Sequence, residues 1–99
     1  MKGRKEIYIG GSKYFLKSVD RIKKPPGKYG KNVQIFGQFR PDNHEIAFIN
    51  KLGYQKNITI VHELLHAIAF EFGGSLSEDD INVLSRELVG SMSQLGIIK

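Results

Sequence analysis

A run of apolar residues at helical spacing dominates the second half of this sequence. It follows Asn57, a residue type that often caps helices, and it stops at the pair Gly73-Gly74. Most positions between Ile60 and Phe70 are apolar, which predicts a helix that is buried on most of its circumference. Such a helix has to be covered by other elements of the chain.

The first half of the chain predicts strands that can cover this helix. Two pairs of β-rich segments each flank a turn signal, which is typical of hairpins. The first pair is 7–9 and 14–19 around Gly10-Gly11-Ser12, and the second is 32–39 and 46–49 around 40–43. Sequential hairpins favour antiparallel pairing throughout the sheet.

A second helix is expected to begin after Ser77. The Ser77 hydroxyl can cap it, and acidic residues fill its first turn. Its expected core stripe is Ile81, Leu84, Leu88 and Leu95, together with Met92. Strands followed by helices predict an α+β fold, with a small antiparallel sheet of two hairpins packed against two helices on one face. Residues 1–99 are expected to form a single domain.

Charge and cysteine content limit the chemistry that this chain can perform. There is no cysteine, so any metal ion must be held by His, Asp or Glu.

The charge is distributed unevenly along the chain. Residues 1–56 hold 13 Lys and Arg against 4 Asp and Glu, whereas residues 57–99 hold 2 Lys and Arg against 6 Asp and Glu. No apolar run approaches the roughly 20 residues of a membrane span. We therefore expect a cytoplasmic protein without membrane contact, whose basic half permits nucleic-acid binding without requiring it.

The sequence His62-Glu63-Leu64-Leu65-His66 lies within the apolar helix. Side chains four residues apart project from the same helix face, so both imidazoles can bind one metal ion. Glu63 is offset by about 100° from His62 and can serve as the general base beside the ion. Buried ionisable groups are costly unless they are paired or bound to metal. The motif therefore predicts a Zn²⁺ site with His62 and His66 as ligands and Glu63 as the catalytic residue.

A third ligand is expected from the acidic residues of the second helix. Asp80 is favoured because it borders the expected core stripe. Glu87 would need the helix to run deeper past the metal, and Glu78 would need the helix to be rotated. The third histidine, His44, sits beside a turn and is expected to be solvated.

With these residues in hand, the chain resembles the zincin metallopeptidases, in particular the short ImmA/IrrE-like type of phages and prophages. The resemblance covers roughly residues 30–90. It rests on the strand pair ending in 45–50, on the motif helix around 59–68 and on a following helix that begins with acidic residues. It implies that an acid on the later helix is the third ligand, with Asp80 standing where the family usually carries Glu. It also implies a zinc-dependent endopeptidase acting on a polypeptide substrate, often a repressor or other regulatory protein, inside a bacterial host. Compared with most active members of that family, these 99 residues are expected to form a shorter chain without the additional helices.

The expected reaction is hydrolysis of a peptide bond, with Glu63 taking a proton from the attacking water. Tyr54 or His44 could stabilise the oxyanion, and one strand of the second hairpin is expected to hold extended substrate at the sheet edge. One alternative is a catalytically silent zinc-binding module, in which the ion only stabilises a small domain. The other is a basic nucleic-acid-binding protein that uses the Arg21–Lys31 loop.

Overall fold

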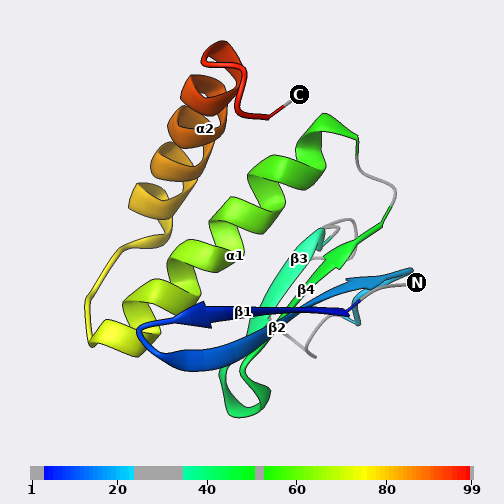
Figure 1. The fold of residues 1–99 in the computed structure, drawn as a ribbon, viewed down its shortest axis with the longest axis vertical. Coiled ribbons are helices and arrows are strands. Elements are labelled where there is room, and N and C mark those ends of the chain that lie inside the picture. The colour runs from blue at the N-terminus through cyan, green and yellow to red at the C-terminus, as the bar shows by residue number, and fades with distance from the viewer. Residues whose placement is uncertain (1–3, 24–34, 51–52, 99) are drawn as a thin grey trace.

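The computed structural model describes residues 4–23, 35–50 and 53–98. These residues form strands, one short 3₁₀ turn and two helices, arranged as an α+β fold (Figure 1). In chain order the elements are β1 (Arg4–Ile9), β2 (Ser12–Val19), β3 (Gly37–Arg40), the 3₁₀ turn (Pro41–Asn43), β4 (Glu45–Ile49), α1 (Tyr54–Phe72) and α2 (Glu78–Gln94). The expected fold class is confirmed.

Strands β1 and β2 form the first expected hairpin. They pair antiparallel, and Ile9 lies opposite Ser12 across a two-residue turn. Both turn residues, Gly10 and Gly11, have positive φ angles of 58° and 85°. A turn of this type twists in the same sense as the strands and strongly favours glycine.

The second hairpin joins the first through a parallel pair of strands. Strand β3 pairs antiparallel with β4, and β4 pairs parallel with β2, which gives the sheet order β1-β2-β4-β3. The sheet is therefore mixed, whereas the sequence of hairpins predicts antiparallel pairing throughout. Residues 32–34 of the second hairpin's first expected strand lie outside the described residues. In the described part, β3 is the edge strand beyond β4.

Helix α1 crosses one face of the sheet (Figure 1). It begins at Tyr54, three residues before the expected cap Asn57, and it ends as expected, with Gly73 at the C-cap in the left-handed conformation. Only a narrow line of side chains on α1 is buried: Thr59, Glu63 and Ala67. The expected burial around most of the circumference is wrong, because the helix is covered on the sheet side and along α2 but leaves Phe70 53% exposed.

Glycine at position 37 allows α1 to approach the edge strand closely. A Cβ atom at Gly37 would lie 2.5 Å from Thr59 Cγ2 and 3.1 Å from Glu63 Cγ. Both distances are below ordinary van der Waals contact, so a side chain at this position would push the helix away from β3. The close approach brings Glu63 against the edge strand.

Helix α2 packs along α1, and α1 separates it from the sheet (Figure 1). Its N-cap is Ser77, as expected, and the Ser77 hydroxyl accepts a hydrogen bond from the Asp80 backbone N–H at 3.0 Å. The buried stripe consists of Ile81, Ser85 and Val89. Leu84 and Leu88, which were expected in the core, are exposed, so the helix is rotated relative to the expected orientation.

The buried core lies between the sheet and α1. It contains Ile9, Tyr14, Ile46 and Ala67, against which Ile7, Leu16, Phe39 and Leu64 pack. Neither described helix is both long enough and apolar enough to cross a membrane.

Candidate metal centre

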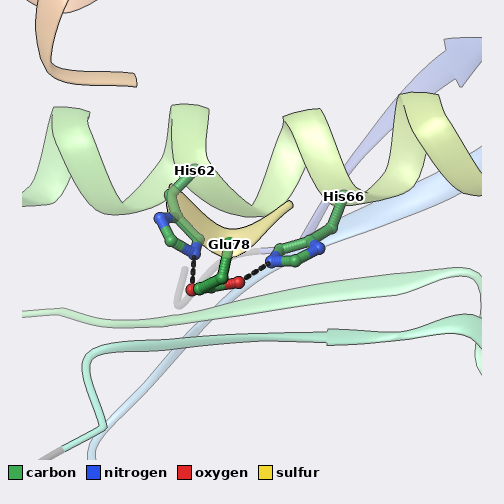
Figure 2. Close-up of side chains that lie close together, drawn as sticks. All are labelled: His62, His66 and Glu78. Atoms are coloured by element: carbon green, nitrogen blue, oxygen red, sulfur yellow. Dashed lines mark ion pairs between the residues drawn. The ribbon is translucent and has the colours of Figure 1, made fainter. Parts of the chain in front are cut away.

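His62 and His66 project side by side from α1 (Figure 2). They stand one turn apart, and their ring centroids are 5.1 Å from each other. The helical spacing of the motif therefore places both imidazoles on one face, as the sequence predicts.

The Glu78 carboxylate lies between the two imidazoles (Figure 2). One carboxylate oxygen, Oε2, is 3.0 Å from His62 Nε2, and the other, Oε1, is 3.1 Å from His66 Nε2. Glu78 is the first residue of α2 and directly follows the capping residue Ser77. The cap therefore fixes the backbone from which this carboxylate extends.

Asp80, the favoured third ligand, is not the carboxylate that the structure brings to the imidazoles. Two residues of helix turn a side chain by about 200°, so Asp80 points away from the side on which Glu78 lies. Its backbone is engaged by the Ser77 cap, and its side chain is exposed. Glu87, the other alternative, is also exposed and lies more than two turns further along α2.

The rotation of α2 explains why Glu78 takes this place. Glu78 stands three residues before Ile81, on the side of the helix that continues into the buried Ser85 and Val89. A stripe of side chains through Leu84 and Leu88, as expected from the sequence, instead passes near Asp80. The sequence pattern that indicates Glu78 is the spacing of the smaller residues Ser85 and Val89, which lie on its side of the helix. The more apolar leucines indicate a different side.

The donor atoms of His62, His66 and Glu78 fit a metal ion. One ligand atom from each residue lies within 4.8 Å of the other two. Ligand atoms around a tetrahedral zinc ion stand about 3.4 Å apart, given metal–ligand distances of about 2.0–2.2 Å. The two His–Glu78 distances, each to a different carboxylate oxygen, are somewhat shorter than this value. Two imidazoles with one carboxylate are a donor set that zinc accepts in catalytic sites.

Glu63 lies beside this group but faces the sheet. Its side chain is buried, and its carboxylate accepts a hydrogen bond from the backbone N–H of Phe39 on β3. Its Oε2 atom is 4.0 Å from His62 Nε2. Burial, together with the nearby charge of Glu78, raises the pKa of Glu63 to about 7, and the Phe39 hydrogen bond acts in the opposite direction.

The environment of His62 favours its neutral form. Burial lowers the pKa of this imidazole below its ordinary value, and the nearby His66 acts in the same direction, while Glu78 opposes both. Neutral imidazole is the form that binds metal ions. The surroundings of His62 therefore suit a ligand.

Among the described residues, no strand pairs with the outer edge of β3, which lies beside Glu63. The Ile49 N–H donates to the Phe36 carbonyl at 2.9 Å, and hydrogen-bonded pairs alternate along antiparallel strands. The peptide groups of Gly37 and Phe39 therefore point away from β4. One of them, the Phe39 N–H, meets Glu63. The other outward groups, which are the Gly37 N–H and the carbonyls of Gly37 and Phe39, can hold an extended chain along β3 by main-chain pairing.

Neither expected oxyanion donor lies at this group of residues. His44 stacks on Tyr14 with ring centroids 4.3 Å apart, and its Nδ1 atom is 3.1 Å from the Lys13 carbonyl oxygen. Tyr54 begins α1, about 12 Å along the helix axis before His62.

Most of the basic loop expected to bind nucleic acid, Arg21–Lys31, lies outside the described residues. Arg21 and Lys23 are described, and both are exposed.

No protein family, curated protein or solved structure matches this chain.

Proposed function

We propose that this protein is a zinc-dependent endopeptidase that hydrolyses an extended polypeptide lying along β3. The observation that carries the proposal is the convergence of His62, His66 and Glu78, with Glu63 held beside them by Phe39. Three protein ligands leave room for water in a tetrahedral zinc site, as hydrolysis requires. Glu78 replaces Asp80 in this assignment.

The chain's own residues have separate roles in the proposed reaction. His62, His66 and Glu78 would hold the ion, which lowers the pKa of a coordinated water to about 7. Glu63 would accept the proton of the attacking water and deliver it to the leaving amine. The Phe39 N–H orients the Glu63 carboxylate, and the remaining outward peptide groups of β3 would align the substrate backbone.

Burial of Glu63 favours hydrolysis over a purely structural zinc site. A structural zinc ion is usually closed by four protein ligands, whereas the group found among the described residues has three. Glu63 is close to this group without belonging to it. Burial of a carboxylate costs free energy that the Phe39 hydrogen bond offsets only in part. The position of Glu63 beside the three donors is the one that proton transfer requires.

The Glu63→Gln variant tests the proposal. Metal content by elemental analysis and cleavage of an unstructured polypeptide, such as casein, are measured for the wild type and for the variant. We expect about one zinc per chain in both proteins and cleavage by the wild type alone, because glutamine cannot accept the proton. The His62→Ala, His66→Ala double variant is the matched control and should lose both zinc and cleavage.

Two results would contradict the proposal. A folded wild type that takes up no zinc when it is added back lacks the metal centre altogether. Cleavage by Glu63→Gln at the wild-type rate would remove Glu63 from the mechanism. Zinc binding without cleavage of any polypeptide would instead favour the catalytically silent zinc module.

A further inference from the structure

An exposed aromatic side chain continues the line of candidate ligands along α1. Phe70 follows His66 by four residues and therefore lies one turn further on the same face. Its side chain is 53% exposed. A phenylalanine exposed to this degree leaves most of its apolar surface in water, which costs free energy that burial would recover.

Phe70 contacts the edge strand through Phe39. The two rings meet edge to face, with centroids 5.6 Å apart. Phe39 is also the residue whose backbone N–H binds the Glu63 carboxylate. The aromatic pair is therefore continuous with both the candidate base and the outer edge of β3, the last strand of the described sheet.

The other exposed phenylalanine of α1 lacks these relations. Phe72 is 68% exposed, but it packs at the tip of the first hairpin, where a Cβ atom on Gly10 would lie 2.8 Å from its ring. Phe72 thus serves as an internal comparison for Phe70. The two residues share a chemical type and a helix and differ in their proximity to the metal centre.

We propose that Phe39 and Phe70 form an aromatic platform that receives a large apolar side chain of a polypeptide extended along β3. The substrate class is then an unfolded polypeptide segment with an aromatic or large aliphatic residue near the bond to be cleaved. The catalytic part of this inference rests on the proposed function, whereas the binding part does not.

The directions of α1 and β3 determine on which side of the cleaved bond the selected apolar residue of the substrate lies. Helix α1 and strand β3 run in the same direction. Thr59 is close to Gly37, and the later residue Phe70 contacts the later residue Phe39. The platform is therefore displaced from Glu63 toward the C-terminal end of β3. A chain that pairs antiparallel with β3 has its own N-terminal side there. In a chain that runs in this antiparallel direction, the selected residue precedes the cleaved bond.

Peptide binding to the Glu63→Gln variant, measured with and without added zinc, tests the platform without requiring hydrolysis or a bound metal ion. Fluorescent peptides with Phe, Leu, Ala or Glu at one varied position are titrated and followed by anisotropy. We expect the Phe and Leu peptides to bind roughly tenfold more tightly than the Ala and Glu peptides, as burial of a large apolar side chain predicts. Adding Phe70→Ala should abolish this preference, and adding Phe72→Ala should leave it intact.

Equal binding of all four peptides, binding of none, or the same loss in the Phe70→Ala and Phe72→Ala variants would overturn the inference. If Phe70→Ala does not fold, Phe70→Leu replaces it and is expected to shift the preference from Phe toward Leu. Hydrolysis of the same peptides by the wild type is scored separately. Cleavage without apolar preference overturns the platform alone, and apolar-selective binding without cleavage overturns the peptidase alone.

Discussion

Glu78 and Ile81 lie one helical turn apart on the same side of α2, so the residue that anchors the helix to α1 also aligns the carboxylate with the two imidazoles. Ile81 is 1% exposed, and Glu78 reaches both His62 and His66. The position of this carboxylate is therefore set by packing between the helices.

The two acids at the start of α2 should differ sharply in metal binding. We expect Glu78→Gln to weaken zinc binding by more than about 100-fold, because even indirect supports of a metal ligand contribute about 10–100-fold. Asp80→Asn makes the same chemical change on the opposite side of the helix and should retain zinc. Competition with a chromophoric chelator measures both affinities. Loss of zinc in Asp80→Asn alone would return the third ligand to Asp80.

Zinc should stabilise the folded protein by binding only the folded state. At a free zinc concentration of about 100 times Kd, the gain is about 2.7 kcal/mol, which corresponds to a rise in Tm of roughly 10 °C or more for a chain of this size. Thermal unfolding with zinc and with a chelator measures it. The His62→Ala, His66→Ala variant should show no difference between the two conditions, and a shift of the same size there would place the zinc elsewhere.

Substitution of Gly37 should be destabilising for a steric reason. Gly37→Ala places a methyl group 2.5 Å from Thr59 Cγ2, and we expect a loss of about 1–3 kcal/mol in the free energy of unfolding, measured in urea. Gly90→Ala is the control, because no atom lies within 4 Å of its added Cβ, and it should stabilise α2 by up to about 1 kcal/mol. Thr59→Ser removes the clashing methyl group and should recover part of the Gly37→Ala loss.

Alkaline pH should reveal the environment of Tyr14. Burial, followed by the hydrogen bond to Glu71 and the charge of Glu71, raises the pKa of the Tyr14 phenol to about 12. The folded state thus favours the neutral phenol. Its contribution to stability is complete below the ordinary pKa of about 10 and is lost as the pH rises toward 12. Ultraviolet absorbance should show a tyrosine step near pH 12 that Tyr14→Phe removes; a titration curve unchanged by that substitution would contradict this assignment.

Local signals in the sequence predicted much of the fold, because they act over a few residues. The Gly10-Gly11 turn, the Ser77 cap and the Gly73 end of α1 all lie where their local chemistry predicts. The spacing of His62 and His66 likewise predicted their shared helix face.

Features that depend on contacts between distant segments were not predictable in this way. Leu84 and Leu88 are more apolar than Ser85, yet α2 turns its smaller residues inward. Small side chains let two helix axes approach closely, and the sequence pattern does not reveal which fit prevails. The same holds for the parallel pairing of β2 with β4, which no local signal specifies.

The separation of the metal donors from the base along the chain has a consequence for folding. His62, His66 and Glu78 all belong to one helical hairpin, whereas the burial of Glu63 depends on the more distant strand β3. Strand β3 and helix α1 precede Glu78 in the chain, so Glu63 can be covered before the third donor has been synthesised. Under the proposed function, a growing chain would therefore acquire its ion, and with it hydrolytic competence, only after α2 has packed along α1. A partly synthesised molecule would then be harmless to the polypeptides around it.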